Sequence, residues 1–71
     1  MTPEKREHGR VRTYDHFKGF GFIRREKGKD VFFFYDQITE DDKNLSEGDT
    51  VSFTVDDAPK GPRALEIRKE G

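Results

Sequence analysis

Cysteine and tryptophan are absent from this 71-residue chain, and histidine occurs only twice. Without cysteine, no disulfide can reinforce the fold, and cysteine-based zinc sites are excluded. His8 and His16 are too few for a metal cluster, so we expect no metal and no cofactor. No apolar run approaches the length of a signal peptide or a membrane span. We therefore expect a soluble, cytoplasmic, monomeric protein that has no contact with membranes.

Apolar residues are also scarce, since 30% of the chain is hydrophobic and 41% is charged. A chain this short makes one small domain with a thin core. We expect residues 1–7, which are polar, to form a flexible tail and residues 8–71 to form the domain. Seven phenylalanines are a large share of the apolar residues. Where they lie decides both the core and the function.

The net charge of −1 hides an uneven distribution of charge along the chain. Residues 1–29 hold nine Lys or Arg and four Asp or Glu, a charge of +5, whereas residues 30–71 carry −6. Binding to a polyanion requires a local basic patch and not a basic whole. A charge run is more often only a solvated face, so the basic front half indicates a nucleic-acid site only together with other features.

Five segments are rich in alternating, β-branched or aromatic residues and are separated by turn residues. The predicted strands are 8–14, 20–25, 30–35, 50–56 and 63–68. In the first, Arg12 and Tyr14 are expected to share the outer face. Between the third and the fourth, Thr39 and Asp42 resemble a helix start. Closing one short sheet on itself buries one face and removes open edges, which predicts an all-β, five-stranded antiparallel barrel.

Strand parity divides the phenylalanines between two faces. Phe20 and Phe22 point away from Ile23 of the same strand. In the next strand, Phe32 and Phe34 point away from Val31 and Phe33. Because side chains alternate between the two faces of a strand, the residues of both faces cannot be buried in one interior. The four rings are therefore expected outside the core, where exposed apolar patches usually mark binding sites. The predicted core is Val11, Ile23, Val31, Phe33, Ile38, Leu45, Val51, Phe53, Val55, Leu65 and Ile67.

Basic residues such as Lys18 and Lys29 flank this aromatic surface. Rings framed by cations suit single-stranded nucleic acid, because each base offers a π-face and each phosphate a charge. The alternative is a surface that docks a protein partner or a hairpin that dimerises. No nucleophile lies in a motif, and the pairs Asp41-Asp42 and Asp56-Asp57 suit solvated turns better than metal sites. We expect no enzymatic activity, no catalytic residue and no small-molecule substrate.

Two segments, Lys18-Gly19-Phe20-Gly21-Phe22-Ile23 and Asp30-Val31-Phe32-Phe33-Phe34-Tyr35, resemble the two ribonucleoprotein motifs of the cold-shock domain family of small bacterial and archaeal proteins. The flanking pieces agree in order, from Gly9-Arg10-Val11 to Lys60-Gly61-Pro62, so the resemblance covers nearly the whole chain. It implies an OB-type barrel that binds single-stranded RNA and DNA. Such proteins commonly act as RNA chaperones or as regulators of transcription and translation.

The resemblance also implies binding positions, and it shows departures from the family pattern. Thr13 stands where the family typically has an exposed Trp that stacks a base, and Phe34 stands where it usually has His. Phe34 keeps a stacking face but cannot donate a hydrogen bond. Phe17 is a candidate to replace part of the lost Trp ring. The predicted nucleic-acid-binding residues are Arg12, Tyr14, Lys18, Phe20, Phe22, Lys29, Phe32, Phe34, Tyr35 and Lys60.

Overall fold

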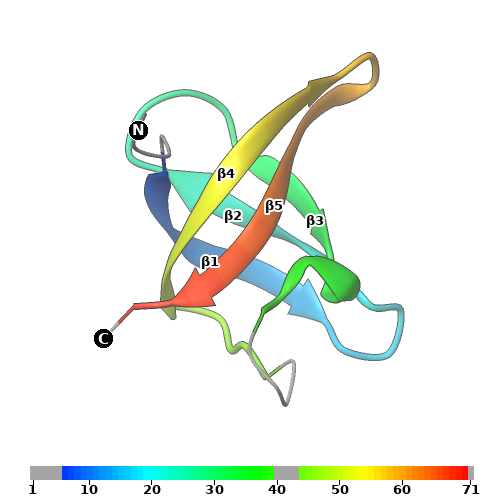
Figure 1. Cartoon of the computed structure of the whole chain (residues 1–71). Coiled ribbons are helices and arrows are strands. Elements are labelled where there is room, and N and C mark those ends of the chain that lie inside the picture. Colours follow the sequence, from blue (N-terminus) through cyan, green and yellow to red (C-terminus); the bar gives the residue numbers. More distant parts are fainter. Residues whose placement is uncertain (1–5, 40–43, 71) are drawn as a thin grey trace.

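A closed barrel forms from the residues that the structure, a computed structural model, describes: 6–39 and 44–70. Its elements are β1 (Glu7–Asp15), β2 (Phe20–Arg25), β3 (Val31–Phe34), the 3₁₀ helix η1 (Tyr35–Gln37), β4 (Thr50–Ala58) and β5 (Gly61–Lys69). The strands follow one another around the barrel as β1-β2-β3-β5-β4 (Figure 1). Neighbours are antiparallel except for β3 and β5, which close the barrel as a parallel pair. The predicted fold class is confirmed.

The element boundaries differ from the expected ones mainly at strand ends. The second strand has the predicted bounds, whereas the third stops at Phe34 because Tyr35–Gln37 turns into η1, where the Ile38 amide donates to the Tyr35 carbonyl. The helix start expected at Thr39 and Asp42 falls on residues 40–43 and lies outside the described residues. In the described part of the chain, no helix has the length and apolar character needed to cross a membrane.

The barrel includes Arg6 and Glu7, the last two residues of the expected tail. Glu7 begins β1, and its partner in the β4 ladder is Phe53. Arg6 Nη2 donates to the Ser52 hydroxyl at 3.1 Å, and that hydroxyl donates to Glu70 at 2.7 Å. These contacts join the two ends of the described chain through one buried serine.

Most of the predicted core is buried, but Val55 and Leu65 are not. Leu65 is half-buried, and Ala64 takes the inward position beside it. The cause is a bulge in β5. Ser52 pairs with Arg68 and Thr54 pairs with Leu65, so β5 contains one extra residue in this stretch, where Glu66 has a positive φ of 49° and the two-residue alternation is broken. The buried hydrophobic residues are Val11, Tyr14, Ile23, Val31, Phe33, Ile38, Leu45, Val51, Phe53, Ala64 and Ile67.

A β-bulge in β1 corrects the expected position of Tyr14. Val11 pairs with Ile23, and Thr13 pairs with Phe22, the next residue of β2, so Arg12 is an extra residue in the ladder. An extra residue inverts the alternation beyond it. Tyr14 therefore points inward, with 9% of its surface exposed. The prediction that Tyr14 shares the outer face of Arg12 is wrong.

Gly21 explains why a glycine separates two aromatic residues in β2. A Cβ at this position would lie 2.2 Å from the Thr13 carbonyl oxygen and 2.9 Å from the ring of Phe33. The Phe33 ring thus occupies the inner space that a side chain at Gly21 would need. Because glycine leaves this space to the core ring, β2 can present Phe20 and Phe22 on its other side.

Candidate nucleic-acid interface

Four phenylalanine rings form one continuous surface on the outer side of β2 and β3. Phe20 pairs with Phe34 and Phe22 pairs with Phe32, so each ring lies directly across the ladder from another. The Phe32 centroid is 5.6 Å from that of Phe20, 5.5 Å from that of Phe22 and 4.7 Å from that of Phe34. These are contact distances between aromatic rings, and two of the pairs meet edge to face. We call Phe20, Phe22, Phe32 and Phe34 the aromatic platform.

The platform is accessible to solvent although it is assembled from apolar side chains. Phe22 and Phe34 are 38% and 45% exposed, whereas Phe20 and Phe32 are half-buried between their neighbours. Phe33, between two platform residues in sequence, is fully buried on the other side of β3. The four rings thus lie outside the core, as the strand parity predicts.

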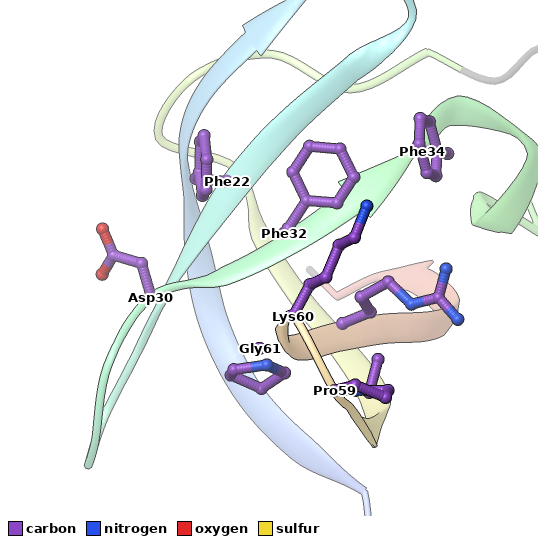
Figure 2. A pocket seen from close by; sticks show the side chains of 10 residues that line it. Phe22, Asp30, Phe32, Phe34, Pro59, Lys60 and Gly61 are labelled. Atoms are coloured by element: carbon purple, nitrogen blue, oxygen red, sulfur yellow. The ribbon is translucent and has the colours of Figure 1, made fainter.

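The turn between β4 and β5 forms the opposite wall of a shallow groove along the platform. This groove is lined by Phe22, Asp30, Phe32, Phe34, Ala58, Pro59, Lys60, Gly61, Pro62 and Arg63. In Figure 2, Phe22, Phe32 and Phe34 stand in a row, and the Lys60 side chain rises from the turn with its amino group directed toward them. The parallel pairing of Phe32 with Arg63 holds the two walls together. Lys60 is therefore a cation of the same groove.

Arg12 is ion-paired at the end of the groove. Its Nη1 donates to Asp30 Oδ2 at 2.6 Å, and 64% of the arginine side chain is exposed. An exposed pair contributes little to stability, so a phosphate can compete with Asp30 for the guanidinium. In the absence of a phosphate, Asp30 compensates the charge of Arg12. The sequence pattern did not indicate this ion pair.

Lys18 and Phe17 are presented by the turn between β1 and β2. Asp15 Oδ1 accepts hydrogen bonds from the backbone amides of Phe17 and Lys18, both at 3.0 Å. The Phe17 ring is 98% exposed. Since Asp15 pairs with Phe20 and Thr13 pairs with Phe22, this turn lies beyond the Phe20 end of the platform and not beside Thr13.

The remaining predicted residues lie at the two ends of the platform. Tyr35 follows Phe34 and is 52% exposed, and its ring packs 2.9 Å from where a Cβ of Gly19 would lie. Lys29 lies in the turn between β2 and β3, and its carbonyl accepts a hydrogen bond from Arg25 Nε at 2.7 Å. Within residues 6–39 and 44–70, the side chains of Lys18, Lys29 and Lys60 have no hydrogen bond or ion pair.

The groove is also lined by Pro59, Pro62 and Arg63, which are not among the binding residues predicted from the sequence. Their turn carries a visible signal, because Pro59, Gly61 and Pro62 are strong breakers. That signal predicts a turn but does not show what the turn faces. In the described residues, no group of three His, Asp or Glu side chains could hold a metal ion.

The family model of the 'Cold-shock' DNA-binding domain matches residues 7–70. The chain belongs to the cold-shock domain family. The Retron Se72 cold shock-like protein of Salmonella heidelberg is 46% identical over 65 residues, which cover 89% of this chain and 97% of that protein. Cold shock protein CspC of Bacillus subtilis is 44% identical over 64 residues, with 89% and 97% covered.

A solved cold-shock structure has the same fold. The Drosophila structure Unr CSD456 matches with a TM-score of 0.81 and 29% identity, over 96% of this chain. This chain spans 28% of the length of that one. Cold-shock domains are nucleic-acid-binding domains, so the platform and its basic neighbours lie on a protein of a nucleic-acid-binding family.

Tyr14 of this cold-shock domain belongs to the buried core and not to the surface of the platform. Its ring centroid lies 5.3 Å from that of the buried Phe33 and 4.2 Å from that of His16. Burial raises the pKa of the Tyr14 phenol above its ordinary value, and the nearby Tyr35 acts in the same direction. Ionising this phenol therefore opposes folding.

We expect Tyr14→Phe to make the cold-shock domain less sensitive to alkali. Because the pKa of Tyr14 is higher in the folded state than in the unfolded state, its stabilising contribution is complete below the unfolded pKa, about 10, and is lost as the pH rises through the folded pKa. Unfolding midpoints measured between neutral pH and pH of about 11 should fall less steeply for Tyr14→Phe than for the wild type, with Tyr35→Phe as the control. Equal alkaline slopes for wild type and Tyr14→Phe would contradict this role.

Proposed function

We propose that this cold-shock domain binds single-stranded RNA or DNA with bases stacked on the aromatic platform, and that it acts as an RNA chaperone or as a regulator of transcription or translation. The observation that carries the proposal is a set of four rings, three of them in contact with the central Phe32, on the outer face of a barrel whose core is filled by other residues. Stacking on an aromatic ring contributes about 1–3 kcal/mol per base. Since every base has a π-face, such binding tolerates many sequences.

Cationic side chains around the platform are placed to contact the phosphates of a bound single strand. Lys18 lies near the Phe20 end, Lys60 lies across the groove, and Lys29 lies in the turn after β2. Arg12 joins them when a phosphate displaces Asp30. These groups would follow the backbone of a strand whose bases face the rings, and Tyr35 would extend the stacking surface past Phe34. Tyr14, which is buried, is not part of the proposed contact surface.

We expect salt to separate the two kinds of contact. Affinity for a pyrimidine-rich oligonucleotide should fall with salt with a log–log slope of about −0.7 per phosphate contact. Lys18→Ala should make the slope shallower by about 0.7, because it removes one phosphate contact. Phe22→Ala should lower affinity equally at every salt concentration, because salt hardly screens stacking. The measurement is a fluorescence-anisotropy titration of a labelled oligonucleotide at several salt concentrations.

Two results of this titration would contradict the proposal. In the first, Phe22→Ala removes the salt dependence while Lys18→Ala has no effect. In the second, the wild type binds neither single-stranded RNA nor single-stranded DNA at low salt, which would favour the alternative that the platform docks a protein partner. A duplex of the same sequence serves as the control ligand, because its bases cannot reach the rings.

A further inference from the structure

A second basic surface lies on the outer side of β1 and β2, past the Phe22 end of the platform. Along β2, Phe20, Phe22 and Arg24 alternate with the buried Gly21 and Ile23, so all three face outward. Successive outward residues on a strand are about 7 Å apart. Arg24 therefore continues the line of the two platform rings by one step.

Arg10 of β1 is the ladder partner of Arg24 and is exposed, as Arg24 is. Two like charges directly opposite each other on neighbouring strands are destabilising. Neither guanidinium has a hydrogen bond or ion pair in the described part of the chain, whereas Arg12 and Arg25 each reach a carboxylate. The pair thus lacks an anion to compensate it.

The space around this pair is a groove and not a flat surface. It is lined by His8, Gly9, Arg10, Arg24, Arg25, Glu26 and Thr50. Of the charged groups in it, Arg25 is engaged by Glu7 at 3.4 Å and by the Lys29 carbonyl. Glu26 is the carboxylate of the lining. Arg10 and Arg24 together carry two positive charges against the one negative charge of Glu26, so the groove favours an anion.

We propose that Arg10 and Arg24 form a phosphate site that extends the aromatic platform along β2. A single strand long enough to pass beyond Phe22 places a backbone phosphate between the two guanidiniums. The phosphate accepts hydrogen bonds from both forks, a geometry that arginine favours, and it relieves the repulsion between them. This inference rests on the proposed function. It implies that the protein contacts a longer stretch of single-stranded nucleic acid than the platform alone would cover.

The test compares a short and a long oligonucleotide. A three-nucleotide pyrimidine probe covers the rings alone, and a probe of about eight nucleotides, within the usual range for one OB fold, passes over both sites. In the variant Arg10→Gln/Arg24→Gln, affinity for the long probe should fall roughly tenfold, on the scale of one or two charge-assisted hydrogen bonds. Its salt slope should become shallower by about 0.7. Affinity for the short probe should stay within about twofold.

A control with the same change in charge is Arg68→Gln/Lys69→Gln at the end of β5. It should lower affinity for both probes by the same small factor. The inference is overturned if the wild type prefers the long probe and Arg10→Gln/Arg24→Gln keeps that preference, or if the wild type binds both probes equally. If the wild type binds neither probe, the proposed function fails as well, so the two failures are distinguishable.

A stability measurement without nucleic acid provides an independent readout. Because Arg24→Gln removes one of two opposed charges, its unfolding midpoint at low salt should equal or exceed that of the wild type. Added phosphate ions should raise the wild-type midpoint more than that of Arg24→Gln. A lower midpoint for Arg24→Gln would show that the arginine is kept for the fold and would contradict the site.

Discussion

Phe32→Ala is expected to weaken binding of a single-stranded oligonucleotide by about 1–3 kcal/mol, which is roughly 5- to 150-fold, while the barrel stays folded. Phe32 is the ring that contacts the other three platform rings. Its removal takes away one stacking surface and the lateral support of its neighbours. The core does not depend on it, because the buried ring of β3 is Phe33. Circular dichroism would check the fold, and a titration would measure the loss.

Phe17→Ala is the matched control for this experiment. It removes the same ring from a fully exposed position in the turn between β1 and β2, outside the platform contacts. We expect its affinity to stay within about twofold of the wild type, since a ring beyond the platform stacks no central base. If Phe17→Ala loses as much affinity as Phe32→Ala, or if Phe32→Ala unfolds, the platform is not the binding surface proposed here.

Thr13→Trp is expected to tighten binding by up to one stacked base, about 1–3 kcal/mol. Thr13 is exposed and is the ladder partner of Phe22, so an indole there would extend the platform onto β1. The chain has no other tryptophan. The fluorescence of the introduced indole therefore reports stacking directly, and it should change when the oligonucleotide is added.

Phe17→Trp provides the corresponding control, because it places the indole in the turn. There we expect no gain in affinity. Unchanged affinity and unchanged fluorescence in a folded Thr13→Trp variant would show that the strand does not pass over β1. Repeating Thr13→Trp in a Phe17→Ala background tests whether Phe17 already replaces the missing ring.

Features that depend on a strict two-residue period were predictable from the sequence. The parity of Phe20, Phe22, Phe32 and Phe34 follows from uninterrupted strands, and β2 has the predicted bounds. The closed barrel follows from the number of short strands. In each case neighbouring residues along one strand contain the necessary information.

Features that depend on a bulge were not predictable. One extra residue at Arg12 inverts the alternation and buries Tyr14, and one extra residue in β5 near Glu66 places Ala64 instead of Leu65 in the core. A bulge depends on how two strands pair, which neither strand shows by itself. The groove wall at Pro59 has a similar origin, because it depends on the parallel contact between β3 and β5.

The ion pair between Arg12 and Asp30 removes Arg12 from the uncompensated cations of the basic front half. Counting charges along the sequence places Arg12 among the cations of the basic front half, but the fold compensates it. Lys18, Lys29 and Lys60 keep exposed charges around the platform, and Arg10 and Arg24 keep theirs beyond it. Among the residues that the structure describes, lysines and arginines without a carboxylate partner therefore lie around the platform and beyond its Phe22 end although the whole chain carries −1.

An NMR titration of the phenylalanine rings tests most directly whether single-stranded nucleic acid lies on the platform. The seven rings report from three environments: the platform, the exposed turn at Phe17, and the buried positions Phe33 and Phe53. Addition of a pyrimidine-rich oligonucleotide should shift the ring signals of the four platform residues most strongly and those of Phe33 and Phe53 least. Platform signals that stay unchanged while the oligonucleotide binds and shifts residues elsewhere would contradict the proposed function.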